Sequence, residues 1–468
     1  MIIEQIYTGC LAHGAYYIES AGEVAIIDPL RETAPYIDRA NKNDARIKYI
    51  FETHFHADFV SGHIDLAQKT GATIVYGPNA EMEFDAHVAK DGEEFKLGDI
   101  TIVVLHTPGH TMESSTFLLR DEKGNDHAIF SGDTLFIGDV GRPDLAVKTN
   151  LSREDLAGHL YDSLRNKIMP LDDTVVVYPG HGAGSACGKN LSTETQDTLG
   201  NQKASNYALR ADMSKDEFVK EVLDGILPPP QYFPKNVMLN KQGYSSLDEV
   251  KIQGLKALNP TEFEYLANEE EALMLDTREK AEFTKEHIPN SIFIGLDGSF
   301  ASWVGTLITD IKQPIIFISE PGKEDEVITR LARVGYDNIL GYLSGGLHTW
   351  KEAGKEVSEI SSITAQQLHE LSNSQDIKIL DVRKPGEYEA QHIEDAQSYP
   401  LDYLNNNMAQ VTRDTPYYIH CKTGYRSVIA SSILQARGFD VVDVAGGFDA
   451  IEKTGIKTTD FSCSSKTA

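Results

Sequence analysis

Histidines and aspartates gather in four short motifs in the first half of the chain. The motifs are THFHAD, TPGHT, SGDT and YPGHG, and they contain His54, His56, Asp58, His110, Asp133 and His181. One surface histidine, or one aspartate that caps a helix, is common and needs no special explanation. Imidazole and carboxylate groups from four motifs of one domain, however, are the ligand types that divalent metals take. The pattern therefore predicts a metal site.

A cysteine near the end of the chain has the setting of a nucleophile. The sequence HCKTGYRS (420–427) places Cys421 between a predicted strand and a predicted helix. We expect this loop to aim backbone N–H groups at the sulfur, which favours the attacking thiolate. Arg426 is expected to close the loop and to attract anions. A phosphatase loop has five residues between cysteine and arginine, and this loop has four, which disfavours phosphate chemistry.

Apolar runs that read as buried strands lead into the His/Asp motifs and define the scaffold that must position them. These runs cover residues 25–28, 49–53, 101–105, 128–133 and 174–180. They are rich in β-branched residues and end in polar or glycine-containing turns. Sites commonly lie on loops at strand ends of such scaffolds. The segment 227–246 contains four prolines, and we interpret it as a linker or an arm without a regular helix.

An internal repeat determines the organisation of the second half. Residues 273–294 match residues 378–400, with paired aspartates, arginines and histidines: Asp276 with Asp381, Arg278 with Arg383, and His287 with His392. Each copy is a small α/β domain of roughly 100 residues. We therefore predict a first domain over 1–235, a linker over 236–256, and two repeat domains over 257–357 and 358–458.

Bulk composition excludes several function classes. The formal charge of −28 argues against nucleic acid or an anionic membrane as a partner. It allows a small anionic substrate, because a local arginine or metal ion outweighs distant, salt-screened carboxylates. We predict no secretory signal and no membrane span. The cysteines are too scattered for a disulfide framework, which indicates free thiols in a reducing cytoplasm; they are Cys10, Cys187, Cys421 and Cys463.

Residues 1–235 resemble the metallo-β-lactamase superfamily, which implies an αββα sandwich. The HxHxDH signature of that family appears as His54-Phe55-His56-Ala57-Asp58-Phe59, so phenylalanine replaces the last histidine, a ligand of the second metal. We therefore expect one metal per chain. Within the superfamily, resemblance to persulfide dioxygenases implies iron(II) held by His54, His110 and Asp133, which form a facial triad. His56, Asp58 and His181 would then orient ligands and hold water. Zinc on His54, His56 and His110 remains open.

Two further residues enter through the same resemblance. Arg142 follows Asp133 by nine residues, the spacing at which an arginine meets the substrate carboxylate in glutathione-using relatives. Cys187 follows His181 by six residues and is interpreted as a small buried cysteine rather than a catalytic one.

The repeat domains resemble rhodaneses, which implies that Cys421 carries a persulfide and that Arg426 attracts thiosulfate or sulfite. In the first copy, Ser319 stands opposite Cys421 and Glu324 opposite Arg426. A serine cannot form a persulfide and a glutamate repels anions, so this copy is expected to be non-catalytic.

The two resemblances together imply a sulfide-detoxification enzyme. A low-molecular-weight thiol persulfide and O₂ would give sulfite at iron, and Cys421 would transfer sulfur to or from thiosulfate. A homo-oligomer is compatible with all these features. One alternative is a zinc thioester hydrolase of the glyoxalase II type with accessory rhodanese modules. Another is a non-catalytic sulfur carrier or sensor with a structural metal.

Overall fold

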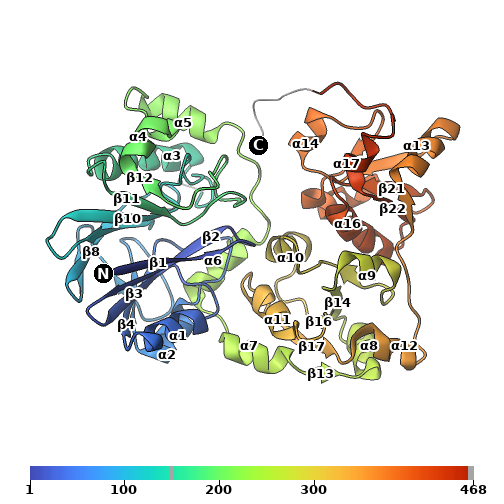
Figure 1. The fold of residues 1–468 in the computed structure, drawn as a ribbon, viewed down its shortest axis with the longest axis horizontal. Coiled ribbons are helices and arrows are strands. Elements are labelled where there is room, and N and C mark those ends of the chain that lie inside the picture. The colour runs from blue at the N-terminus through green and yellow to red at the C-terminus, as the bar shows by residue number, and fades with distance from the viewer. Residues whose placement is uncertain (148–150, 462–468) are drawn as a thin grey trace. The chain divides into compact units, whose positions relative to one another are not determined.

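Two six-stranded sheets form the first part of the chain in the computed structural model, which describes residues 1–147 and 151–461 (Figure 1). The first sheet has the order β1-β2-β3-β4-β5-β6, and its strands are β1 (Ile2–Thr8), β2 (His13–Ser20), β3 (Glu23–Ile27), β4 (Arg46–Glu52), β5 (Thr73–Tyr76) and β6 (His87–Val88). The second has the order β12-β11-β10-β9-β8-β7, from β7 (Glu94–Leu97), β8 (Ile100–His106), β9 (Ser115–Arg120), β10 (Asp126–Gly132), β11 (Val176–Pro179) and β12 (Asp197–Thr198).

The two sheets face each other across an apolar core. Phe51 of β4, Val104 of β8 and Phe130 of β10 belong to one buried cluster between them. Several of these strands are apolar along their whole length because helices cover their other faces as well. The helices of this part are α1 (Ala34–Lys42), α2 (His63–Thr70), α3 (Arg153–Ser163), α4 (Leu199–Ser205) and α5 (Lys215–Leu223).

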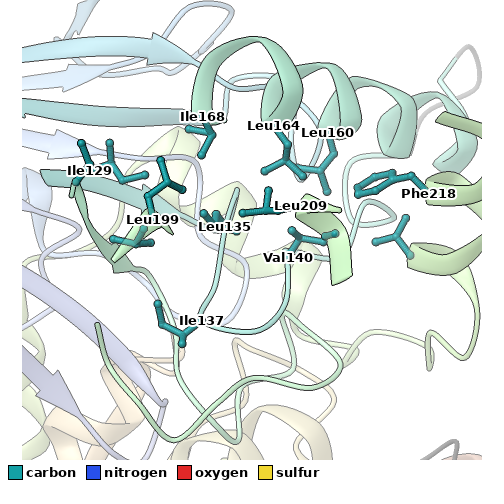
Figure 2. Packing of buried hydrophobic residues seen from close by; sticks show 14 of the residues in the cluster. Ile129, Leu135, Ile137, Val140, Leu160, Leu164, Ile168, Leu199, Leu209 and Phe218 are labelled. Atoms are coloured by element: carbon teal, nitrogen blue, oxygen red, sulfur yellow. The ribbon is translucent and has the colours of Figure 1, made fainter. Parts of the chain in front are cut away.

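Helix packing on the outer faces completes an αββα sandwich. Figure 2 shows Ile129 of β10 in one buried cluster with Leu160 of α3 and Phe218 of α5. Tyr36 of α1 and Leu66 of α2 belong to a corresponding cluster on the first sheet. The predicted αββα architecture is confirmed, and each strand predicted before a His/Asp motif overlaps an observed strand.

The proline-containing segment differs from its prediction. It forms α6 (Phe233–Gln242), with Pro234 in the first turn, where a missing N–H costs nothing because no helical acceptor precedes it. Helix α7 (Leu247–Gly254) follows. The prediction that this segment holds no regular helix was therefore wrong, because three of its four prolines precede α6 and the fourth lies in its first turn.

Two units make up the chain: Met1–Leu247 with Ala332–Gly335, and Asp248–Leu331 with the residues from Tyr336 onward. The second unit contains two parallel five-stranded sheets of the same order, β13-β17-β16-β14-β15 and β18-β22-β21-β19-β20. The first consists of β13 (Ala257–Leu258), β14 (Leu273–Asp276), β15 (Ile292–Phe293), β16 (Ile315–Ile318) and β17 (Ile339–Leu343). The second consists of β18 (Ser362–Thr364), β19 (Lys378–Asp381), β20 (Gln397–Ser398), β21 (Tyr417–His420) and β22 (Val441–Ala445). The predicted repeat is confirmed.

Helices flank both sheets of the second unit. The first copy has α8 (Pro260–Glu269), α9 (Lys280–Lys285), α10 (Phe300–Leu307), α11 (Glu324–Ala332) and α12 (Gly346–Glu352). The second has α13 (Ala365–Ser374), α14 (Pro385–Ala390), α15 (Leu404–Asn407), α16 (Tyr425–Ala436) and α17 (Gly447–Ile451). None of the helices within residues 1–147 and 151–461 has the length and apolar character that a bilayer crossing requires.

The residues that defined the repeat are structural. Arg278 and Arg383 each reach back two residues, and their Nη2 atoms lie 2.6 Å from Oδ2 of Asp276 and Asp381 respectively. All four side chains are buried. Each pair fixes the turn that follows its strand. The repeated Asp and Arg residues therefore stabilise the fold and have no catalytic role.

Candidate functional site

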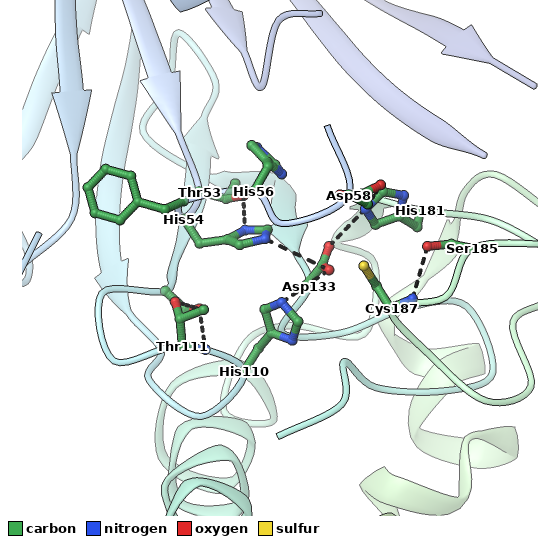
Figure 3. Close-up of polar contacts among 12 residues, drawn as sticks. Thr53, His54, His56, Asp58, His110, Thr111, Asp133, His181, Ser185 and Cys187 are labelled. Atoms are coloured by element: carbon green, nitrogen blue, oxygen red, sulfur yellow. Dashed lines mark hydrogen bonds and ion pairs between the residues drawn. The ribbon is translucent and has the colours of Figure 1, made fainter. Parts of the chain in front are cut away.

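Three side chains from distant parts of the first unit converge on one point. His54 follows β4, His110 follows β8, and Asp133 directly follows β10. The ligand atoms of the three lie within 4.8 Å of one another, and all three residues are buried. The Nε2 atoms of His54 and His110 lie 3.9 and 3.4 Å from Oδ2 of Asp133, as Figure 3 shows. The structure thus brings together the three predicted ligands.

Backbone carbonyls set the orientation of two imidazoles. The Nδ1 atom of His110 lies 2.9 Å from the carbonyl oxygen of Arg142, and Nδ1 of His181 lies 3.2 Å from that of Ala12. Because a carbonyl only accepts, each Nδ1 must donate, and a neutral ring then presents a lone pair at Nε2. Both lone pairs face Asp133, whose carboxylate oxygens have no hydrogen-bond partner among the described residues. Lone pairs that face a carboxylate need a cation or a proton between them, so this set fits a metal ion.

Burial acts in opposite directions on the two kinds of ligand. It lowers the pKa of His110 to about 3, which favours the neutral imidazole that binds metals. Burial, reinforced by the charge of Asp58, raises the pKa of Asp133 well above its usual range. Asp133 therefore needs a cation beside it to stay ionised at neutral pH.

His56 turns toward a different set of groups. Its Nε2 atom lies 3.1 Å from Oδ1 of Asp28 and 3.4 Å from Oε2 of Glu52. Burial lowers the pKa of His56, but Asp28 and Glu52 outweigh that effect and raise it well above the ordinary value. Nδ1 of His56 has no hydrogen-bond partner among the described residues, and a carboxylate on the outer nitrogen is also the usual setting of a metal-bound histidine. The ligand atoms of His56 thus group with those of Asp28 and Glu52, whereas those of His54, His110 and Asp133 form a group of their own.

A second group of donors lies on the other side of Asp133. The Nε2 atom of His181 is 3.5 Å from Oδ2 of Asp58 and 3.6 Å from Oδ1 of Asp133. The sulfur of Cys187 joins Asp58 and His181 within 4.8 Å, and Figure 3 shows it directed toward Asp133. Cys187 is 1% exposed, and burial, together with the charges of Asp58 and Asp133, raises its pKa well above the ordinary value. The sequence indicated a small buried cysteine here but not its closeness to these ligands.

Phe59 occupies the space beside the site. Its ring centroid lies 4.3 Å from those of both His56 and His13, and its side chain is completely buried. It adds apolar contact at the position where the HxHxDH signature has its last histidine.

Arg142 is engaged within the protein. Its Nε and Nη2 atoms donate to the two carboxylate oxygens of Asp144, both at 2.7 Å. Nη2 also donates to the carbonyl of Leu227 at 2.5 Å. The guanidinium expected to meet a substrate carboxylate thus already has one, while the carbonyl of Arg142 positions His110.

Asn240 is a site residue that sequence reasoning missed. It lies in α6, and its Nδ2 donates to the carbonyls of His56 and Phe59, both at 2.8 Å. Its Oδ1 accepts from the backbone N–H of Ser61 at 2.9 Å. The amide thereby fixes the loop that carries the HxHxD residues. The four prolines of this segment predicted a linker without a helix, and a single asparagine has no sequence pattern that marks it as a site residue.

The Cys421 loop joins β21 to α16 in the second unit. The backbone N–H of Gly424 donates to Cys421 Sγ at 3.1 Å, and Gly424 has φ of 105°, a conformation that favours glycine. Cys421 is 1% exposed. Arg426 forms a two-point ion pair with Glu387, with N–O distances of 2.6 and 2.9 Å. One backbone N–H of the loop therefore meets the sulfur of Cys421, whereas the charge of Arg426 is already compensated by Glu387.

Comparisons with known proteins agree with this organisation. The metallo-beta-lactamase superfamily model matches residues 8–181, and the rhodanese-like domain model matches residues 259–353 and 364–454. Human mitochondrial persulfide dioxygenase is 32% identical over 212 residues, which cover 45% of this chain and 74% of that protein. A probable hydroxyacylglutathione hydrolase of Schizosaccharomyces pombe is 30% identical over 181 residues, 38% of this chain and 66% of the hydrolase, slightly under two thirds of its length.

One solved structure resembles most of the chain. It is described as a metallo-beta-lactamase from Staphylococcus aureus, and it shares 31% identity with a TM-score of 0.64. The match covers 73% of this chain and 98% of that one. The chain therefore belongs to the metallo-β-lactamase superfamily, as a metallo-β-lactamase domain fused to two rhodanese domains.

Proposed function

We propose that the chain is a persulfide dioxygenase coupled to a rhodanese. Its first domain would convert a low-molecular-weight thiol persulfide, such as glutathione persulfide, with O₂ and water to the thiol and sulfite. The balance is RSSH + O₂ + H₂O → RSH + SO₃²⁻ + 2 H⁺. One iron(II) per chain, held by His54, His110 and Asp133, would supply open coordination positions at which persulfide and O₂ react.

The grouping of the donor atoms of His54, His110 and Asp133 carries this proposal. The ligand atoms of His54, His110 and Asp133 lie within 4.8 Å of one another, and two imidazoles with one carboxylate are the facial triad used by non-haem iron oxygenases. Phe59 supports it, because a ligand for a second metal is replaced by an apolar ring. Zinc hydrolases of this fold instead gain their nucleophile from metal-bound water.

The residues around the triad would orient its ligands and exclude water. Thr53 Oγ1 lies 3.0 Å from Nδ1 of His54, and the carbonyl of Arg142 fixes His110. Asp58 and His181 would hold water or substrate beside Asp133. Arg142 would meet a substrate carboxylate only by releasing Asp144. Its backbone carbonyl, which orients His110, is therefore the role that the contacts support better.

Cys421 would exchange sulfane sulfur with thiosulfate and sulfite. Its thiolate attacks the outer sulfur of thiosulfate, the S–S bond breaks, and sulfite leaves with the bonding pair: Cys–S⁻ + S–SO₃²⁻ → Cys–S–S⁻ + SO₃²⁻. The reverse reaction makes thiosulfate from the sulfite of the first domain at raised effective concentration. Cys421 is free in this structure, and a reducing cytoplasm would keep it so.

Two variants test the separation of the activities. His110→Ala should abolish O₂ consumption and spare thiocyanate formation from thiosulfate and cyanide. Cys421→Ser should do the reverse. Loss of both activities in either variant would contradict the two-site account.

A zinc thioester hydrolase is the second candidate, because a relative of comparable identity is described as a probable hydroxyacylglutathione hydrolase. Metal analysis of protein purified without added metal distinguishes the two. Stoichiometric zinc without iron, together with thioester hydrolysis, would favour the hydrolase.

A further inference from the structure

The arginine of the Cys421 loop, Arg426, offers no free positive charge to an incoming anion. Sulfite and thiosulfate are dianions, and their approach to a thiolate costs electrostatic energy unless a positive group faces them. Arg426, the group expected to serve, is tied to Glu387 through both carboxylate oxygens. A two-point ion pair of this kind leaves little net positive potential for a further anion.

Lys280 of the other copy lies against the same loop. A Cβ atom built on Gly424 would meet Lys280 Nζ at 3.0 Å, and Gly424 is the residue whose N–H donates to Cys421 Sγ. Lys280 starts α9, which packs against α16 within the second unit (Figure 1). Its side chain is exposed, and its ammonium makes no hydrogen bond or ion pair with another described residue, although it lies near enough to the buried Asp443 to lower the pKa of that carboxyl group.

The position of Lys280 has no counterpart in the other copy. The repeat pairs Asp276 with Asp381 and Arg278 with Arg383, and continuing that register places Pro385 opposite Lys280. The lysine therefore does not belong to the repeated framework. Lys280 thus belongs to the first copy, which has no cysteine nucleophile.

A cavity of about 330 Å³ joins the two copies beside this lysine. Lys280, Phe293 and Gly295 of the first copy and Tyr425 of the second line it. The hydroxyl of Tyr425 donates to the carbonyl of Gly295 at 2.8 Å, which holds the two sides together. Such a volume is ample for a sulfur oxyanion.

The other charged groups of the cavity limit where an anion can sit. Arg278 is already paired with Asp276, and the acidic residues Glu279 and Asp297 also line the cavity. Because Coulomb attraction falls with distance, net attraction is expected only close to Lys280 and the Gly424 end of the loop.

We propose that the Cys-less copy completes the sulfur-transfer site, with Lys280 binding the anionic oxygens of sulfite or thiosulfate while their sulfur meets Cys421. This inference deepens the proposed function and rests on its sulfurtransfer half. It gives the first copy a substrate-binding role although Ser319 stands where its nucleophile would be.

Alkylation of Cys421 tests the anion subsite without requiring sulfurtransfer. Iodoacetate is anionic and iodoacetamide is neutral, and the two otherwise react with the same thiolate. Rates are followed by mass spectrometry of the Cys421 peptide in the full chain. In Lys280→Gln, iodoacetate should react about threefold to fivefold more slowly, the effect of losing one partly screened charge interaction. Iodoacetamide should react at the wild-type rate within about twofold, and Lys280→Arg should restore the iodoacetate rate.

Two control variants separate Lys280 from other lysines. Lys285 is exposed at the far end of α9, so Lys285→Gln should leave both rates unchanged. Lys422 belongs to the loop itself, and a loss confined to Lys422→Gln would overturn the proposal. Equal rates for the wild type and Lys280→Gln with iodoacetate would overturn it as well.

Steady-state kinetics give the second readout. Lys280→Gln should raise KM for thiosulfate about threefold to tenfold and leave kcat within about twofold. If the wild type shows no thiosulfate turnover but its iodoacetate rate still depends on Lys280, the proposed sulfurtransfer fails while the anion subsite stands. If turnover is present and neither KM nor alkylation depends on Lys280, only the subsite fails.

Discussion

The Nε2 atom of His110 lies 3.4 Å from Oδ2 of Asp133, and the opposite nitrogen of the ring is held by the carbonyl of Arg142. The ring therefore cannot donate to Asp133 as a neutral imidazole, although both groups are buried. Such a pair is costly without a cation between its members. This relationship is the physical basis for treating the site as a metal centre.

Removal of His110 should therefore abolish metal binding. Loss of one outer hydrogen-bonding partner of a ligand weakens metal affinity 10- to 100-fold, and loss of the ligand itself should exceed about 100-fold. Iron titration of His110→Ala monitors this, with the exposed His348→Ala as control. Iron retention at the wild-type affinity would contradict the proposed ligand set.

Phe59→His should create the ligand that this chain lacks for a second metal. The new imidazole would join Asp58 and His181, in which Oδ2 of Asp58 lies 3.5 Å from Nε2 of His181. We expect metal content in excess zinc to rise from one to two ions per chain by elemental analysis. Phe59→Leu is the matched apolar control. A content of one ion in Phe59→His would show that Phe59 does not set the stoichiometry.

Asn240→Ala should loosen the metal loop. The substitution leaves the backbone groups of His56, Phe59 and Ser61 without their partner in a buried setting. We expect a loss of about 2–3 kcal/mol in the free energy of unfolding, together with weaker iron binding. Urea denaturation and iron titration measure the two effects. Met238→Ala, on an exposed position of the same helix, should change neither.

Glu387→Gln should release Arg426 and strengthen anion binding at the Cys421 loop. The ion pair has N–O distances of 2.6 and 2.9 Å, and removal of its negative partner leaves a free guanidinium near the thiol. KM for thiosulfate should fall about twofold to fivefold. An unchanged or higher KM would place Arg426 outside the reach of substrate.

Asp443 should make stability depend on pH. Burial raises the pKa of Asp443 to about 6, against opposing effects of Ser427 and Lys280. A raised folded-state pKa means that its stabilising contribution is complete below the unfolded value near 3.8 and is lost as pH rises through about 6. Asp443→Asn should therefore raise the free energy of unfolding by about 3 kcal/mol at pH 8, since each unit of pKa shift corresponds to about 1.4 kcal/mol.

Urea unfolding of the two proteins from pH 4 to pH 8 tests this expectation. The difference between Asp443→Asn and the wild type should shrink to nothing near pH 4. A constant difference over that range would show that burial does not raise the pKa of Asp443.

Sequence reasoning succeeded where the signal is local. Val- and Ile-rich runs ending in polar turns predicted β4, β8 and β10, and hence the convergence of His54, His110 and Asp133. The repeat was visible because the same Asp–Arg turn recurs at one spacing, and the structure shows why that turn is kept: each arginine is paired with its own aspartate.

Partners distant in sequence could not be predicted in this way. Asn240 contacts a loop about 180 residues earlier, and Glu387 neutralises Arg426 from another helix. Their residue types are common on any surface, and only the folded chain shows which ones are buried against a site. The turn of His56 toward Asp28 likewise depends on packing between strands rather than on the HxHxD spacing.

Oxygen uptake by the iron-loaded full chain with glutathione persulfide tests the central claim most directly. The account predicts one O₂ consumed per sulfite formed, with sulfite measured in Cys421→Ser so that sulfurtransfer cannot divert it. It also predicts no uptake when zinc replaces iron. Hydrolysis of a glutathione thioester by the zinc form, without persulfide-dependent O₂ uptake by the iron form, would contradict it.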